Sequence, residues 1–191
     1  MPVFDASAAT QNYFITNAGS ADFEIFASSS STFYDWTTSE GHRIVASGTG
    51  ISVNGANQPT AGIITSITID LGNNSPLNPD IEITGLDLDL TDFDFSSGAD
   101  SSERFWELVL EGETEFILSD TVNIRAVGDY VNVPAGDAIA GADDIFNMTN
   151  ATFSPTFGDA NDVQGLLFGG DDVFTRRGGL VFGDAATIVG N

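Results

Sequence analysis

Cysteine and lysine are both absent from this chain of 191 residues. Without cysteine, no disulfide framework can cross-link the fold. The 5 basic residues are all arginine and face 28 acidic ones, which gives a net charge of −23. Phosphate groups are bound by clustered lysine and arginine, so nucleic acid and anionic membrane surfaces are not expected partners. Cations and cationic surfaces are the natural counterparts.

Long apolar runs are missing as well. No segment approaches the roughly 20 apolar residues that a membrane-spanning helix needs, so membrane insertion is not expected. The first residues, MPVFDASAATQNYF, contain neither the basic nor the apolar part of a secretory signal peptide. We therefore expect a protein that is either intracellular or exported by a route that does not read the N-terminus. Apolar residues still make up 41% of the chain, more than disordered acidic segments contain, so we expect it to fold.

Strand patterns dominate the first half of the sequence. The alternation in GIITSITIDL predicts a half-buried strand, and Asn54-Gly55 just upstream predicts the tight turn of a hairpin. The residues that share the expected buried face of this strand are Ile63, Thr65, Ile67, Ile69 and Leu71.

The apolar residues change parity twice in IEITGLDLDLTDFDF. A one-residue slip sends every side chain to the opposite face, so each change requires a bulge or a turn. We expect these at Thr84-Gly85 and at Thr91-Asp92. The acids of this segment are expected mainly on the solvated face of the strands rather than in a metal site; they are Asp87, Asp89, Asp92 and Asp94.

The segment DSSERFWELVLEG predicts one short helix near residues 101–111. Asp100 can cap its start, with Glu103 three residues further on, and Gly112 is a natural stop. The apolar residues in between fall on one side, which would face a core.

From Leu118 onward the sequence repeats a short unit, which is an acid, any residue and then an apolar residue. Its acids are Asp120, Asp129, Asp137, Asp144 and, later, Asp172. The first four are 9, 8 and 7 residues apart, close to one turn of a small parallel β-solenoid. A larger recurrence is also visible, because DDIF at 143 returns as DDVF at 171 and FGDA at 157 returns at 182.

These features resemble the hemolysin-type calcium-binding (RTX) repeats of bacterial proteins secreted by type I exporters, whose unit is G-G-x-G-x-D-x-U-x with U a large apolar residue. The resemblance implies a β-roll in which glycine turns alternate with short strands and calcium lies between successive turns. Paired glycines survive only at 169–170 and 178–179, and Arg176-Arg177 stands where the family has glycine, so these repeats are degenerate. The family's arrays continue beyond units such as FGDAATIVGN, so we expect either the start of a longer array or one that has lost its last repeats.

The resemblance places calcium at the Gly/Asp turns of the two larger repeats. Calcium takes about 6 to 8 oxygen ligands from carboxylates and backbone carbonyls, and glycine turns expose both. The candidate calcium ligands are Asp143, Asp144, Asp159, Asp171, Asp172 and Asp184. In the alternative interpretation, these side chains only form Asx-turns and solubilise the loops.

We therefore expect an all-β protein with an antiparallel β module and one short helix over residues 1–117. A degenerate parallel β-roll or β-solenoid would follow over residues 118–191. The expected function is that of a calcium-binding, secreted and non-catalytic structural or adhesive module in the extracellular space. Its partners would be calcium ions, together with further copies of itself or a cell-surface polysaccharide.

Two other functions stay open at this point. The rings of Phe33, Tyr34 and Trp36 could form the sugar-stacking platform of a carbohydrate-binding β-sandwich, although such rings are more often core residues. A hydrolase with an acid pair would need an acid and a nucleophile that no motif singles out. The one histidine, His42, is expected at the surface beside Arg43 rather than in a catalytic triad.

Overall fold

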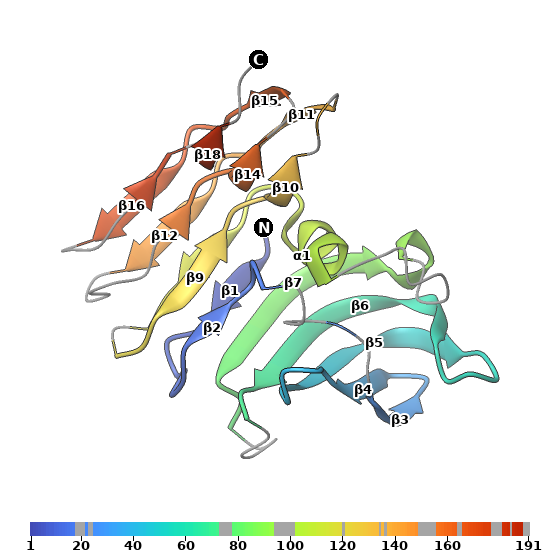
Figure 1. The fold of residues 1–191 in the computed structure, drawn as a ribbon. Helices are drawn as coiled ribbons and strands as arrows, with labels where there is room; N and C mark the ends of the chain where they lie inside the picture. The colour runs from blue at the N-terminus through green and yellow to red at the C-terminus, as the bar shows by residue number, and fades with distance from the viewer. Residues whose placement is uncertain are drawn as a thin grey trace.

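The computed structural model describes residues 1–17, 22, 25–72, 78–93, 102–119, 121–133, 135, 137–148, 156–163, 166–176, 181–183 and 185–188. Within these residues β-strands predominate and are joined by one α-helix and one short 3-10 helix, which confirms the all-β class. In Figure 1 the blue-to-green strands of the first part form one broad sheet, and the yellow-to-red strands of the second part lie side by side above it.

Antiparallel pairing builds most of the first part. Its strands are β1 (Val3–Asp5), β3 (Ile25–Ser30), β4 (Phe33–Thr37), β5 (Arg43–Val53), β6 (Pro59–Asp70) and β7 (Ile81–Asp89). They neighbour one another in the order β3-β4-β5-β6-β7-β1. The Asn54 N–H donates to the Gln58 carbonyl (2.9 Å) between β5 and β6, which confirms the hairpin expected at Asn54-Gly55.

The buried face expected for β6 is correct only in its second half. The alternation holds from Ile67 onward, but Thr65 is exposed and Ile64 is buried in place of Ile63. The register with β7 shifts between Ile64 and Ser66, and this irregularity changes which parity faces the core. The expectation was wrong there because no glycine or proline marks the shift in the sequence.

Both expected changes of parity after residue 81 are confirmed. Thr84 and Gly85 are both exposed, and Gly85 has a φ of +75°, which few residues other than glycine adopt. The second change is made by the 3-10 helix η1 (Leu90–Asp92), after which Phe93 is buried.

The acids of this segment lie mainly where the alternation predicts. Asp87 and Asp92 are exposed, and Asp89 is half-buried. The Asp89 carboxylate caps η1 by accepting the N–H and the hydroxyl of Thr91, both at 2.8 Å. Asp94 lies outside the described residues.

The expected helix is confirmed as α1 (Ser102–Leu110). Gly112, with a φ of +85°, follows its end, and Phe105 and Trp106 are buried against the sheet and the repeats. The expected cap at Asp100 and the side chain of Glu103 lie outside what the structure describes. The helix contacts both β7 and the second part of the chain.

Parallel pairing builds the second part. Its strands, with two from earlier in the chain, are β2 (Tyr13–Phe14), β8 (Glu115–Ile117), β9 (Ile124–Val127), β10 (Tyr130–Val133), β11 (Ala138–Ala140), β12 (Ile145–Met148), β13 (Thr156–Phe157), β14 (Ala160–Val163), β15 (Leu166–Phe168), β16 (Val173–Arg176), β17 (Val181–Phe182) and β18 (Ala185–Ile188). We call β9 to β12 the first repeat and β13 to β16 the second repeat. They pair strand by strand, and β17 and β18 then pair with β13 and β14.

Equivalent positions in neighbouring repeats lie 25 to 30 residues apart. Ala126 pairs with Thr156 and Thr156 with Val181, while Ile145 pairs with Val173. The larger recurrences seen in the sequence therefore mark the structural repeat, since DDIF lies beside DDVF and the two FGDA segments lie beside each other. The spacing of about nine residues is not the period of this pairing, because a full repeat holds four strands and not one.

The N-terminal strands connect the two parts. Strand β1 pairs antiparallel with β7 and parallel with β8, and β2 pairs parallel with β9. Since β12 and β16 extend the sheet beyond β8, one mixed sheet of nine strands crosses the expected boundary at residue 117.

Two apolar clusters support the repeats. The main core contains Phe116 and Phe146 stacked at a centroid distance of 4.5 Å, and Phe174 packs on Phe146 at 4.7 Å. A second, small cluster gathers Val133, Ala160 and Val163 around β10 and β14. The chain therefore crosses from one cluster to the other within each repeat, and the functional candidates lie at these crossings.

Candidate functional site

The structure separates the six predicted calcium ligands into three groups. Asp144 and Asp159 are fully buried, each 0% exposed, and Asp172 is half-buried. Asp143 and Asp171 are exposed. Asp184 lies outside the described residues. Neighbouring acids with the same sequence context therefore occupy different environments.

One further acid belongs to the buried group. Asp129 is 4% exposed and is equivalent to Asp159, because β9 and β10 on either side of it pair with β13 and β14. Sequence reasoning counted Asp129 among the short units but left it out of the site. The dipeptide Gly-Asp at 128, 158 and 183 was the signal that could have found it. We call Asp129, Asp144, Asp159 and Asp172 the aspartate cluster.

Two members of the cluster bind the backbone of the preceding strand. The Thr114 N–H donates to Asp144 Oδ1 (2.7 Å), and one repeat later the Asp144 N–H donates to Asp172 Oδ1 (3.0 Å). Thr114, Asp144 and Asp172 precede β8, β12 and β16, which pair with one another in register. The same contact therefore recurs from repeat to repeat.

The other two members tie the crossings together within a repeat. The Ala142 N–H donates to Asp129 Oδ2 (2.7 Å), and the Gly170 N–H donates to Asp159 Oδ1 (2.8 Å). Asp129 Oδ1 also accepts the Gly112 N–H (3.3 Å). The bonds from Ala142 and Gly170 join the two crossings of one repeat, whereas the bond from Gly112 joins the first repeat to the segment that follows α1.

Glycine makes room for these carboxylates. A Cβ on Gly128 would overlap with Asp144 Oδ2 and with the carbonyl oxygen of Gly158. A Cβ on Gly158 would in turn overlap with Asp172 Oδ2 and with the carbonyl oxygen of Gly183. Each glycine thus leaves a cradle that brings one carboxylate oxygen and one carbonyl oxygen close together.

Burial changes the protonation of the cluster. The pKa of Asp144 is raised to about 8, mainly by burial and also by the nearby charges of Asp129, Asp172 and Asp159, against the lowering effect of the Thr114 N–H. Burial also raises the pKa of Asp129 to about 6, although the N–H groups that it accepts oppose this shift. Without a cation, the buried carboxyl of Asp144 is therefore held mainly as the neutral acid at pH 7.

One oxygen of the Asp144 carboxylate is available for a further interaction. This oxygen, Oδ2, is buried and has no hydrogen-bond partner among the residues that the structure describes. A buried oxygen in this position can carry a proton or bind a cation. Within the same described ranges, no three acidic or histidine side chains are already close enough together to hold a metal ion.

The two exposed acids make a separate contact. The Asp171 N–H donates to Asp143 Oδ1 (2.8 Å), which links the two repeats at the surface. This bond satisfies a backbone donor in the way that an Asx-turn does, but across repeats. Asp143 therefore serves the stacking of the repeats whether or not it meets a cation.

The other candidate residues have structural partners. Asp35 receives two hydrogen bonds from Arg43, at 2.6 and 3.0 Å, and is 3% exposed. His42, expected at the surface, has a side chain that is only 13% exposed and lies 3.4 Å from Glu40. Burial lowers the pKa of His42, although Glu40 opposes this.

The aromatic residues of β4 belong to the core. Tyr34 is 4% exposed and Trp36 is 1% exposed, and their rings pack in a tilted arrangement at a centroid distance of 5.4 Å. Phe33 is half-buried. These rings do not form an exposed platform for sugar stacking, so the core interpretation of this segment is confirmed.

Comparison with protein-family models, with curated proteins and with solved structures found no match. No helix in the described part of the chain is long and apolar enough to cross a membrane.

Proposed function

We propose that residues 118–191 form a parallel β-solenoid whose aspartate cluster binds Ca²⁺, and that the protein is a secreted, non-catalytic structural or adhesive module. The observation that carries this proposal is the buried Oδ2 of Asp144 beside the Gly128 cradle. The cradle itself recurs one repeat later, where a Cβ on Gly158 would overlap with the Asp172 carboxylate. Strand-by-strand parallel pairing at a period of 25 to 30 residues supports the solenoid.

The chemistry of the cluster suits calcium. A hard cation prefers carboxylate and carbonyl oxygens, and both meet at each glycine cradle. The charges of Asp129, Asp159 and Asp172 raise the pKa of Asp144, and a divalent cation would offset this repulsion. The cation would also bind the buried Oδ2 of Asp144. Asp144, Asp159 and Asp172 would hold the ion, and Asp129 would lie next to it.

Binding would have to draw carboxylates of neighbouring repeats together, since three of them do not converge beforehand in the described residues. Calcium would then cross-link neighbouring repeats rather than fill a preformed site. Binding of this kind stabilises the folded state by mass action where calcium is abundant, as it is outside cells. This is the reason for proposing an extracellular role for so acidic a chain.

The far edge of the repeats supports self-association as part of this function. Among the described strands, β16 is the last of the nine-stranded sheet and pairs only with β12. Phe168 and Val173 beside it are 60% and 55% exposed. An open edge with apolar side chains is a site at which further repeats or another copy can add.

The test is thermal unfolding followed by circular dichroism in millimolar calcium, in excess chelator, and in magnesium at matched ionic strength. We expect a higher midpoint in calcium alone, because magnesium loses its water less readily and screening is the same in all three. The variant Asp144→Asn with Asp172→Asn should lose this response, whereas the exposed control Asp137→Asn should keep it. Equal midpoints for the wild type in the three solutions would overturn the proposal.

A further inference from the structure

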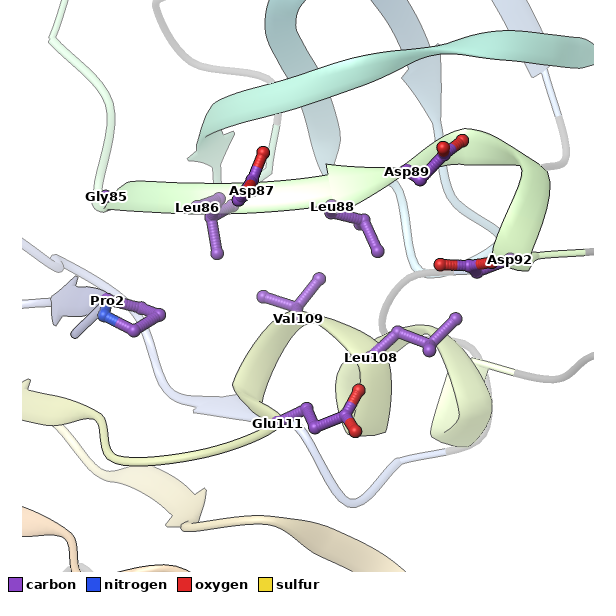
Figure 2. A pocket seen from close by; sticks show the side chains of 10 residues that line it. All are labelled: Pro2, Gly85, Leu86, Asp87, Leu88, Asp89, Asp92, Leu108, Val109 and Glu111. Carbon is purple, nitrogen blue, oxygen red and sulfur yellow. The ribbon is translucent and has the colours of Figure 1, made fainter.

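A second site lies between β7 and α1, and only its border at Glu111 is close enough to the aspartate cluster to raise the pKa of Asp129. Here a cleft of about 270 Å³ opens between the strand and the helix (Figure 2). Its apolar lining combines buried and half-buried side chains from three elements; they are Leu86 and Leu88 on β7, Leu108 and Val109 on α1, and Pro2 before β1.

Carboxylates border this cleft on both sides. Figure 2 shows the Asp92 carboxylate, from the end of η1, directed toward the space between β7 and α1, whereas the Glu111 side chain, just after α1, lies along the helix at the border of the cleft. Asp87 and Asp89 also border the cleft, but their side chains point to the other side of β7, and the Asp89 carboxylate is already bonded to Thr91. The cleft therefore combines an apolar floor with negative charge on both walls.

The ligand chemistry follows from what lines the cleft. None of the described residues that line it is basic, so an anionic ligand would meet only repulsion. None is aromatic either, which removes the usual means of recognising a quaternary ammonium group or a sugar ring. The volume is below the range of about 300–1,000 Å³ that is typical of sites for drug-sized ligands.

We propose that this cleft binds a short linear alkylamine, such as a diamine or polyamine. The alkyl chain would lie on Leu86, Leu88 and Val109, as the stem of a lysine side chain lies on apolar surface. One ammonium group would bind the Asp92 carboxylate inside the cleft, and the second ammonium group of a diamine would bind Glu111 at its border. The net charge of −23 raises the local concentration of such cations.

The experiment uses the full chain, excess chelator and 1,5-diaminopentane as the probe, with binding followed through the methyl resonances of Leu88 and Val109. We expect these methyls to shift with the diamine, but not with pentan-1-ol, which lacks charge, or with ammonium chloride at the same ionic strength. Replacing the two acids at the cleft, Asp92→Asn with Glu111→Gln, should weaken binding by about tenfold, as the loss of two exposed ion pairs would.

Matched variants decide the interpretation. Asp87→Asn removes the same kind of charge from β7, beside the cleft, but the side chain faces away from it, so this variant should leave the affinity unchanged. Leu108→Trp, on a half-buried position at the mouth, should block the cleft without changing the circular dichroism. Equal losses in the Asp87 variant and in the double variant, or shifts that spare Leu88 and Val109, would overturn the proposal. Excess chelator keeps calcium out of the aspartate cluster, so a failure of the diamine to bind would leave the calcium proposal untouched.

Discussion

Replacing Asp144 with asparagine should stabilise the protein at neutral pH when divalent cations are absent. The carboxyl has an ordinary pKa of 3.8 in the unfolded chain, and burial raises the pKa to about 8 in the fold. Between these two values the folded state binds one proton more than the unfolded state. The contribution of Asp144 to stability is therefore complete below pH 3.8 and is lost as the pH rises through about 8.

The size of this effect follows from the shift. Each pKa unit corresponds to about 1.4 kcal/mol, so stability should fall by up to ~4 kcal/mol between pH 4 and pH 7 because of this one carboxyl. Asparagine has nearly the shape of the neutral acid and does not titrate. We expect the variant to match the wild type near pH 4, and to exceed its free energy of unfolding by about 1 to 4 kcal/mol at pH 7.

The assay is urea unfolding in chelator at several pH values, followed by the fluorescence of the two buried tryptophans, Trp36 and Trp106. Asp137→Asn, at an exposed position of the same repeat, controls for the change in net charge. A variant that is less stable than the wild type at pH 7 would refute the inference that Asp144 is neutral in the fold. In calcium the wild type should instead have the higher free energy of unfolding, because only the wild type is stabilised by binding the cation.

Three further outcomes are expected. Gly158→Ala should destabilise the fold by more than ~2 kcal/mol in the same urea titration, because its Cβ would overlap with two oxygens. Gly55→Ala should have little effect, because a Cβ there meets nothing within 4 Å. Phe146→Ala, in the middle of the stacked rings, should cost about 3–5 kcal/mol, against almost nothing for the exposed Phe168→Ala. Asp35→Asn should lower the free energy of unfolding by about 1–3 kcal/mol, since it weakens a charge-assisted pair with a guanidinium; an unchanged midpoint would show that this pair is not stabilising.

Local patterns were enough to predict the elements of the first part. Periodicity over a few residues fixes which side chains share a face, so the helix at 102–110 and the parity changes after residue 81 could be predicted. The change of register near Thr65 could not, because it depends on how β6 pairs with β7. The burial of Tyr34 and Trp36 likewise depends on what packs against β4.

The repeats show the same division at a larger scale. The recurrences of DDIF and FGDA indicated the true period, but the shorter spacing of acids suggested a smaller one. Only the pairing of strands distinguishes the two periods. A spacing in sequence is the structural period only if the chain between two copies forms one complete repeat. Four strands per repeat make that distance 25 to 30 residues.

The sequence by itself determined that this chain is a β protein rich in acid, with one short helix and with aspartates at the turns of a repeat, since composition and local alternation are properties of the chain. The tertiary structure alone decided which aspartates are buried, because Asp143 and Asp144 are neighbours with the same chemistry and only the direction of the strand that follows separates them. It also brought Asp129 to the cluster and placed Asp92 and Glu111 beside the same cleft. In both cases the residues are distant in sequence and meet only when the sheet, the helix and the repeats have packed together.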